Sequence, residues 1–376
     1  MKVYFISKDA NWQKYRLDVL TKLGAAYDHK IEILTTGQLK EHLTDNSFVQ
    51  YKRFKSLLSW KVNFMPGILW YVIRHKPDAV LALNNVSFFT EYLSFIICKI
   101  VGVKFIWWTH GYDHKKSPNS FFSILKEKYV LFFLRKGDAI ITFSNQGREY
   151  LVSKKIKAEK IVTAANTLDT EQILETKANY SGKKTELRVK FGFKDTDKLL
   201  IFTGRLTKEK KIDHAIKALN LLKKEYSDNL KLIIIGDGTE FEPLKDLIKE
   251  LKLENVFLKG EIYDEEILAQ WFTISDLYIM PAYVGLGIIH AFCYELPIIT
   301  EQDENHGPEI QYLESGENGY MVEKNDIDEL SKKIKELISD EILLKQFSQK
   351  AFETLIKKGD INLMVKNMNT AITSIK

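Results

Sequence analysis

Short apolar runs alternate with helical patterns twice along this chain of 376 residues, and this alternation constrains the fold more than any other feature. The runs are apolar on both faces, which is typical of parallel strands buried under helices. In the first half they predict strands at Lys2–Ser7, Ile31–Thr36, Ala79–Leu83, Phe105–Thr109, Ala139–Phe143 and Ile161–Ala164. Residues 1–170 are therefore expected to form one Rossmann-like α/β domain.

The second half repeats the pattern after a polar, weakly periodic stretch at residues 171–198, which we expect to link two domains. Its predicted strands are Leu199–Phe202, Leu232–Ile235, Val256–Leu258, Leu277–Met280, Ile298–Thr300 and Tyr320–Val322. A second Rossmann-like domain is expected over residues 199–358, and a helix at residues 359–376 can pack back on the first domain. Two such domains face each other across a cleft at the carboxyl ends of their strands, where α/β sheets bind ligands.

The net charge of +5 conceals a difference between the two halves. Residues 1–170 carry 26 Lys and Arg against 14 Asp and Glu, whereas the remainder carries 29 against 36. A basic first half suggests an anionic partner. Because no nucleic-acid motif is present, an anionic membrane surface or an acidic lipid-linked substrate fits better than nucleic acid.

No apolar run reaches the roughly 18 residues that span a bilayer, and the first residues lack the pattern of a signal peptide. Cys98 and Cys293 lie in apolar surroundings and are expected to be buried free thiols in a reducing compartment. We therefore expect a cytoplasmic protein, with peripheral attachment to the inner membrane face as an option. A dinucleotide cofactor is not expected, because no G-x-G-x-x-G follows the first strand.

Aromatic and basic side chains are interleaved between Phe48 and His75, a region that we call the basic–aromatic segment. Such a segment can lie in a membrane interface, with Tyr51–Lys61 as the docking part. Alternatively it is a helix whose aromatic side chains pack on the sheet while Lys and Arg face water. The sequence leaves both alternatives open.

The stretch Ile201–Asp213 places an Arg and a Lys five residues apart where a predicted strand ends. Arg205 follows a tight turn at Thr203-Gly204, and a short basic loop leads through Lys210 to an amphipathic helix. Arg offers a planar fork for phosphate oxygens and Lys a mobile point charge, so the pair suits a diphosphate. The alternative is that both are solvated loop charges.

Three further signals follow Arg205 and Lys210 in a fixed order. They are Ile235-Gly236-Asp237-Gly238 with Pro243, then Val256–Gly260 and Ser275–Tyr278, then Pro281–Gly287 with Leu296–Thr300, Pro308-Glu309-Ile310 and Asn318-Gly319. In this order and spacing the chain resembles the retaining nucleotide-sugar glycosyltransferases of family four, which have the GT-B fold. The resemblance is strong over residues 199–325 and weak in the first half, where His110-Gly111 and Asn166–Asp169 carry it.

The resemblance implies that Arg205 and Lys210 neutralise the departing nucleoside diphosphate, whose negative charge grows in the transition state. It also implies a nucleotide-sugar donor and no requirement for a metal ion or another cofactor. The donor-binding residues that it implies are Gly204, Gly236, Gly238, Gly260, Gly285, Leu286, Gly287, Ile288 and His290. The turn at 285–287 opens a helix whose amides can face phosphate or sugar oxygens, and the alternative is a turn that simply needs glycine.

The chain departs from the family at the Glu-x7-Glu pair around this turn. The turn is two residues shorter, His290 takes the position of the second Glu, and Val284 or Ala282 takes that of the first. The chain thus resembles a branch of the family in which the motif is shortened and altered. His290 can still form a hydrogen bond with a ribose hydroxyl, and Glu309 or Glu301 could supply the missing carboxylate.

In the first half, His110 matches the family's position near the donor sugar and the acceptor. The alternative is a structural histidine at a strand end. Asn145, Trp12, Tyr15 and Arg16 also follow predicted strands on the side of the cleft, and we assign them to the acceptor.

Taken together, these features predict a retaining, metal-independent hexosyl- or N-acetylhexosaminyltransferase with a glycan or lipid-linked acceptor in cell-surface polysaccharide biosynthesis. The catalytic residues are expected to be Arg205, Lys210, His110 and Glu309. One alternative is a degenerate GT-B protein that binds nucleotide sugar or glycan without catalysis, which the missing motif glutamates favour. Another is a sugar-nucleotide epimerase, for which no acid–base set can be assembled.

Overall fold

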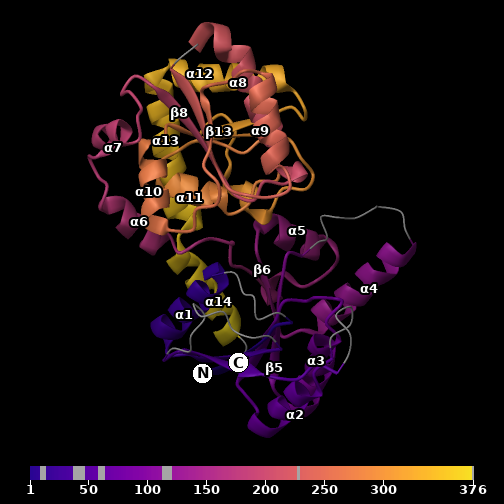
Figure 1. The fold of residues 1–376 in the computed structure, drawn as a ribbon. Coiled ribbons are helices and arrows are strands. Elements are labelled where there is room, and N and C mark those ends of the chain that lie inside the picture. The colour runs from indigo at the N-terminus through magenta and orange to yellow at the C-terminus, as the bar shows by residue number, and fades with distance from the viewer. Residues whose placement is uncertain (9–13, 37–46, 58–63, 112–120, 227–228, 375–376) are drawn as a thin grey trace. The chain divides into compact units, whose positions relative to one another are not determined.

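The computed structural model describes residues 1–8, 14–36, 47–57, 64–111, 121–226 and 229–374, so Trp12 lies outside the described residues. The chain divides into two compact units (Figure 1). Unit 1 comprises Met1–Leu168 and Ile361–Lys376, and unit 2 comprises Asp169–Asp360. Each unit is built around one parallel sheet, as the alternation of strands and helices predicts.

The sheet of unit 1 has seven parallel strands in the order β3-β2-β1-β4-β5-β6-β7. They are β1 (Lys2–Ile6), β2 (Lys30–Thr35), β3 (Val49–Arg53), β4 (Ala79–Ala82), β5 (Lys104–Thr109), β6 (Ala139–Thr142) and β7 (Ile161–Thr163). The helices are α1 (Lys14–Tyr27), α2 (Pro66–His75), α3 (Phe89–Val101), α4 (Phe121–Lys136), α5 (Asn145–Ser153), α14 (Ile361–Thr373) and the short η1 (Ala158–Lys160). The strand order reverses at β1, and ligands bind at such a switch point in open α/β sheets.

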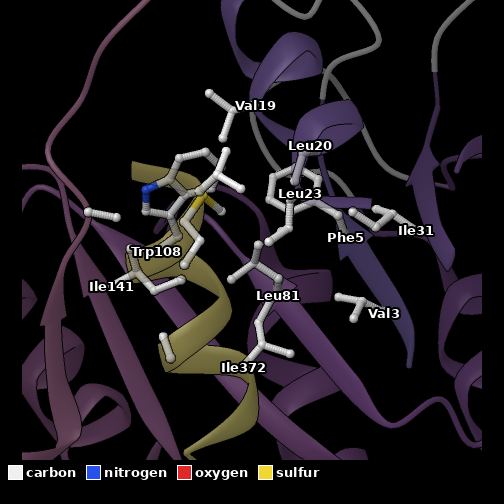
Figure 2. Close-up of a cluster of buried hydrophobic side chains, with 14 of the residues drawn as sticks. Val3, Phe5, Val19, Leu20, Leu23, Ile31, Leu81, Trp108, Ile141 and Ile372 are labelled. Atoms are coloured by element: carbon white, nitrogen blue, oxygen red, sulfur yellow. The ribbon is translucent and has the colours of Figure 1, made fainter. Parts of the chain in front are cut away.

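Both faces of this sheet are buried, because side chains alternate along each strand. Val3 and Phe5 of β1 enter one hydrophobic core together with α1 and α14, whereas Tyr4 and Ile6 enter the other with α2, α3 and α4. Figure 2 shows the first core, where Ile372 of α14 joins side chains of the sheet and of α1. The last helix of the chain thus completes a core that the first strand begins.

The basic–aromatic segment is not a single helix. Its Tyr51–Arg53 belongs to β3, which lies at the edge of the sheet and pairs in parallel with β2, and α2 begins only at Pro66. The helical alternative is therefore wrong for Tyr51–Arg53, whereas residues 58–63 lie outside the described part. The ring of Tyr51 packs against the core that contains α14, and the ammonium of Lys52 lies 4.6 Å from the centre of the Tyr71 ring.

The sheet of unit 2 has six parallel strands in the order β10-β9-β8-β11-β12-β13. They are β8 (Lys198–Thr203), β9 (Leu230–Ile235), β10 (Val256–Leu258), β11 (Leu277–Ile279), β12 (Ile298–Glu301) and β13 (Gly319–Val322). The helices are α6 (Thr170–Ala178), α7 (Lys184–Lys190), α8 (Ile212–Tyr226), α9 (Phe241–Glu250), α10 (Glu265–Ile274), α11 (Gly287–Cys293), α12 (Ile327–Ser339) and α13 (Glu341–Thr354). Shorter turns are η2 (Lys208–Lys210), η3 (Pro308–Tyr312) and η4 (Leu355–Gly359).

Residues 171–198, which we expected to link the domains, are part of unit 2 and contain α6 and α7. Arg188 of α7 is only 4% exposed, and its guanidinium donates to Asp276 Oδ2 at 2.8 Å. Phe191 stacks on Trp271 of α10 with ring centroids 4.1 Å apart. These partners lie far along the chain, so the local pattern of this stretch is weak although its position is fixed.

Cys98 and Cys293 are buried free thiols, as expected from their apolar surroundings. Burial raises the pKa of Cys98 to about 12, so this thiol stays protonated and unreactive at neutral pH. Across the described residues, no helix combines the length and the apolar character needed to cross a membrane.

Met368→Ala should destabilise unit 1, because Met368 of α14 is fully buried in the core of Figure 2. Loss of such a side chain leaves a cavity and costs about 2–5 kcal/mol of the free energy of unfolding. Denaturation by urea, followed by tryptophan fluorescence, measures the effect. Lys366→Ala on the exposed face of the same helix is the control and should change stability by less than about 0.5 kcal/mol. Equal effects would show that α14 contributes little to the core.

Candidate functional site

Four predicted glycines hold the loops at the carboxyl ends of β8, β9 and β10 in close contact. Gly204 follows β8, Gly236 and Gly238 follow β9, and Gly260 follows β10. The amide of Gly236 donates to the carbonyl oxygen of Gly260 at 2.8 Å. A Cβ on Gly236 would lie 1.9 Å from the carbonyl oxygen of Gly204, and one on Gly238 would lie 2.2 Å from that of Leu206. Glycine is required at positions 236 and 238 because the backbones approach so closely there.

The loop after β8 presents the two predicted cations in different environments. Arg205 is exposed, whereas Lys210 at the end of η2 is half-buried. Lys210 Nζ donates to the carbonyl oxygen of Tyr283 at 2.6 Å and lies 4.9 Å from the centre of its ring. Burial lowers the pKa of Lys210 to about 8, and the nearby carboxylate of Glu309 opposes this shift. A cation with so little water around it attracts an anion more strongly than a solvated one.

Tyr283–Gly287 form the turn between β11 and α11, which we call the 283–287 loop. Tyr283 has a φ of +52°, a left-handed conformation that a residue other than glycine keeps only with support from its surroundings. A Cβ on Gly287 would lie 2.2 Å from the Tyr278 hydroxyl oxygen, so Gly287 permits close packing of α11 on β11. Gly285 has no such neighbour within 4 Å. Local packing therefore explains the glycine at position 287, as the alternative of a turn that simply needs glycine states. It does not explain the glycine at position 285.

Leu286 and Ile288, the other two predicted donor-binding residues of this region, have apolar side chains. Leu286 precedes α11 and provides no side-chain hydrogen bond to the helix amides. Ile288 is fully buried. Any contact of these residues with a donor would therefore be made by their backbone, and that role stays a prediction.

Glu309 lies in η3 next to the 283–287 loop and is 4% exposed. Its Oε2 would lie 2.3 Å from a Cβ on Gly307, whose amide donates to the carbonyl oxygen of Val284 at 2.7 Å. The carboxylate is also close enough to Lys210 to act on its pKa. The structure thus brings together Lys210, Glu309 and the 283–287 loop within unit 2.

Glu301 cannot supply a carboxylate to a sugar, and this alternative of the sequence analysis is wrong. Its side chain is fully buried: Oε1 lies 2.5 Å from Nδ1 of His214, and Oε2 accepts from Lys211 Nζ at 3.0 Å and from the Asn325 amide at 2.9 Å. Burial alone raises the pKa of Glu301, but these hydrogen bonds outweigh burial and the pKa is lowered. Glu301 thus binds Lys211, the residue after Lys210, and by this contact anchors the loop that carries Lys210.

His290 of α11 is 9% exposed and faces α10. Its ring stacks on Phe272 with centroids 4.3 Å apart and an interplanar angle of 11°. Nε2 lies 3.1 Å from Oε1 of Glu265 at the start of α10. Hydrogen bonding to a ribose stays a prediction for His290, and Glu265 would compete with the ribose for this nitrogen.

His306 is a further residue of the site that the sequence analysis did not single out. It lies between β12 and η3 and is 5% exposed. Its Nδ1 accepts from the Val284 amide at 3.0 Å, and its Nε2 donates to the carbonyl oxygen of Glu301 at 2.9 Å. The adjacent Pro308-Glu309 was the available signal, but the sequence does not show that His306 turns back to the 283–287 loop.

Unit 1 places its predicted residues at the carboxyl ends of separate strands. His110 directly follows β5, and Asn145 begins α5 after β6; both are exposed. Tyr15 and Arg16 lie in the first turn of α1, where the Arg16 guanidinium is 5.5 Å from the centre of the Tyr15 ring. All four lie on the ligand-binding edge of their own sheet, and their assignment to sugar or acceptor stays a prediction.

Two further observations concern other kinds of site. In the described part of the chain, no group of three or more His, Cys, Asp or Glu side chains could hold a metal ion. A hollow of about 800 Å³ opens in unit 2 near Lys198 at the start of β8 and Asp276 just before β11. These are the amino ends of the strands, so the hollow lies on the edge opposite Arg205 and Lys210.

Two protein families match the chain. Residues 183–354 match Glycosyl transferases group 1, and residues 17–172 match Glycosyltransferase Family 4. The chain is 35% identical over 156 residues to the poly(glycerol-phosphate) alpha-glucosyltransferase of Bacillus subtilis, which covers 41% of this chain and 22% of that protein. It is 30% identical over 165 residues to the poly(ribitol-phosphate) alpha-N-acetylglucosaminyltransferase of Staphylococcus aureus, and the aligned part is 43% of this chain and 33% of that protein. The chain therefore spans about a third or less of these two relatives.

Solved structures resemble the whole chain. The crystal structure of Anabaena HepE in complex with UDP and glucose superimposes with a TM-score of 0.74 at 18% identity and covers 100% of both chains. A glycosyltransferase from Rickettsia africae gives a TM-score of 0.80 at 21% identity, covering 100% of this chain and 98% of that one. At these identities the similarity shows a shared fold.

Gly236→Ala should destabilise unit 2 by about 1–3 kcal/mol, the usual effect of forcing an atom into a closely packed site. The new Cβ would overlap the carbonyl oxygen of Gly204, and φ at Gly236 is +153°. Gly285→Ala is the matched control, because Gly285 has open space around it and no positive φ. Thermal unfolding of the two variants measures the difference, and equal midpoints would contradict the close approach of the loops.

Proposed function

We propose that this protein transfers a hexose or N-acetylhexosamine with retention and without a metal ion. Both halves of the chain match glycosyltransferase families and its fold is GT-B. These findings support a GT-B glycosyltransferase of the group 1 and family 4 type. The donor is a nucleoside diphosphate sugar. The acceptor is a glycan or a lipid-linked chain of a cell-surface polymer. The names of the two relatives support such an acceptor, because they describe alpha-linked transfer to polyol-phosphate polymers. The complex of Anabaena HepE with UDP and glucose supports a donor of this class.

The observation that carries this proposal is the position of Lys210. Its ammonium is half-buried beside the 283–287 loop and the carboxylate of Glu309, and Arg205 lies in the same loop after β8. When the bond from sugar to diphosphate breaks, negative charge grows on the diphosphate, and fixed cations stabilise that charge more than they stabilise the ground state. These two cations would therefore take the part that a divalent metal has in other transferases.

Glu309 is the carboxylate of the described site that is best placed to act at the sugar. It is buried, it lies against Gly307, and it is held close to the positive charge of Lys210. A carboxylate near the anomeric carbon stabilises the positive charge of an oxocarbenium-like transition state. Glu309 thus replaces, from the next loop, the carboxylate that the shortened turn lacks, and His110 of unit 1 is proposed to contact the sugar hydroxyls.

The alternative of a non-catalytic GT-B protein makes a different prediction from the same site. Such a protein would bind a nucleotide sugar through Arg205 and Lys210 but would neither transfer nor hydrolyse the sugar. The carboxylate of Glu309 beside Lys210 favours catalysis, since binding of an anionic diphosphate alone gains nothing from a buried negative charge.

Arg205→Ala and Lys210→Ala should each lower turnover by about 10²–10³-fold, because loss of one preorganised charge-stabilising group costs roughly 2.7–4 kcal/mol. The donor is first identified by testing nucleotide sugars for protection against thermal unfolding, and transfer to polyol-phosphate or lipid-linked acceptors is then followed by mass spectrometry. Lys208→Ala, at an exposed position of the same turn, is the control and should keep full activity. Chelation of metals with EDTA should also leave turnover unchanged.

Three results would contradict the proposal. Wild-type turnover in both charge variants would remove the assigned diphosphate site. A strict requirement for Mg²⁺ or Mn²⁺ would contradict the metal-independent mechanism. Binding of a nucleotide sugar with neither transfer nor hydrolysis would favour the non-catalytic alternative.

We further propose that unit 1 docks on an anionic membrane surface, with the protein located in the cytoplasm. The proposed docking surface lies on α4 and not on the basic–aromatic segment. Four large apolar side chains in the first two turns of α4, which we call the α4 patch, are 46–79% exposed: Phe121, Phe122, Ile124 and Leu125. Lys126 and Lys128 of the same turns are exposed as well.

This combination fits a membrane interface better than water. A helix with apolar side chains beside lysines buries the apolar groups among acyl chains while its charges meet anionic headgroups. The excess of basic over acidic residues in residues 1–170 adds a long-range attraction to the same anionic surface. In Figure 1 the first turns of α4 extend away from the sheet of unit 1, which leaves them accessible.

Phe121→Ser combined with Phe122→Ser should reduce binding to vesicles that contain phosphatidylglycerol at least tenfold, because each buried aromatic ring contributes about 1.5–3 kcal/mol. Sedimentation with the vesicles measures the bound fraction. Tyr263→Ser combined with Ile342→Ser in unit 2, at positions that are 81% and 74% exposed, should have no effect. Absence of binding by the wild type would reject the proposal, and an α4 patch that mediates dimerisation instead would appear in size-exclusion chromatography.

A further inference from the structure

His306 forms two hydrogen bonds whose geometry determines its protonation state. Its Nδ1 faces the amide of Val284, and its Nε2 faces the carbonyl oxygen of Glu301. An amide N–H only donates and a carbonyl oxygen only accepts, so Nδ1 must be bare and Nε2 must carry the proton. The neutral ring with its proton on Nε2 is the one form that satisfies both partners. Protonation of Nδ1 would place two donors opposite each other and break the bond to Val284.

The bond to Val284 lies between two other hydrogen bonds to the 283–287 loop. Lys210 Nζ donates to the carbonyl oxygen of Tyr283 at 2.6 Å, and the Gly307 amide donates to that of Val284 at 2.7 Å. Tyr283 has a left-handed backbone, which depends on such external contacts. His306 supplies the contact to the amide between these two carbonyl groups, and its other bond ties the loop to the end of β12.

The surroundings of His306 favour the neutral ring at neutral pH. Burial has the largest effect and lowers the pKa of His306. The bond to the Glu301 carbonyl oxygen and the charge of Asp303 act to raise this pKa, while Lys210 and Lys211 act to lower it. The carboxylate of Glu309 lies close to Gly307, the residue after His306. Because the folded pKa is below the usual value of about 6.5, the bond to Val284 is present at neutral pH and is lost only as the pH falls through this lowered pKa.

We propose that His306 is a positioning residue of the transfer reaction: its neutral ring holds the 283–287 loop in the shape that receives the donor diphosphate. The effect on transfer rests on the proposed function, whereas the effect on the loop does not. His306 touches no substrate in this scheme. It acts through the Val284 amide, and so this contact holds the loop at neutral pH and is lost as the pH falls through the lowered pKa of His306.

Two measurements test the proposal between pH 5 and 8. Hydrogen exchange by mass spectrometry reports the protection of residues 281–288, corrected for the intrinsic pH dependence of exchange. Calorimetry reports the affinity for the tightest binder among UDP, GDP, ADP and CDP. In the wild type, we expect protection and affinity to fall together below pH 6.5, each by tenfold or more. In His306→Asn, the amide oxygen can still accept from Val284 but does not titrate, so both quantities should become nearly independent of pH.

Controls separate this role from a merely structural one. His306→Phe fills similar space without an acceptor, and it should lower protection and nucleotide affinity at every pH, with a higher KM for the donor sugar. His306→Gln is used in place of His306→Asn if the latter fails to fold. His75→Asn changes an exposed histidine of unit 1 and should leave the pH dependence of the wild type unchanged.

The possible outcomes are distinct. The proposal is overturned if protection of residues 281–288 in the wild type does not change with pH, or if His306→Asn keeps the wild-type pH dependence. If His214→Asn keeps the wild-type pH dependence and His306→Asn loses it, the proposal is supported. His214, the histidine next to Glu301, is then excluded as the cause of that pH dependence. A protein that shows the loop transition but transfers no sugar would refute the proposed function and leave the positioning role of His306 in place.

Discussion

Burial of both faces of two parallel sheets is the constraint on which the rest of this structure depends. Successive residues of β1 enter opposite cores, and helices from both ends of the chain cover them. With both faces covered, polar loops remain only at the edges of each sheet. The carboxyl edge of unit 2 therefore gathers Lys210, the 283–287 loop and Glu309, which are far apart in the sequence.

Backbone groups hold this edge together as much as side chains do. The loops after β8 and β9 touch through glycines that leave no room for a Cβ. Glu301 is a buried carboxylate, and its hydrogen bonds to Lys211 and to the Asn325 amide fix two loops at once. A buried charge is tolerated only with such a set of partners. His306 and Gly307, from the segment after β12, each form a hydrogen bond with Val284 and so support the 283–287 loop.

The two cations of the site differ in a way that matters for binding an anion. Arg205 is exposed and offers the planar fork of a guanidinium. Lys210 has a pKa lowered to about 8 by burial, and Glu309 partly compensates that burial. An arriving diphosphate would add negative charge and favour the protonated form of Lys210 further. A diphosphate bound to Lys210 would thus be linked to the 283–287 loop, whose Tyr283 carbonyl oxygen Lys210 contacts.

The sequence alone determined the two α/β units, because the apolar strands and the glycine turns that follow them are local patterns. It also indicated Arg205, Lys210 and Glu309, since their spacing after strand ends is local too. Only the tertiary structure decided that Tyr51–Arg53 form an edge strand, that residues 171–198 belong to unit 2, and that Glu301 is committed to His214 and Lys211. It alone revealed the contact of His306 with Val284. These features depend on partners distant in the chain, and residue periodicity carries no information about which distant groups will meet.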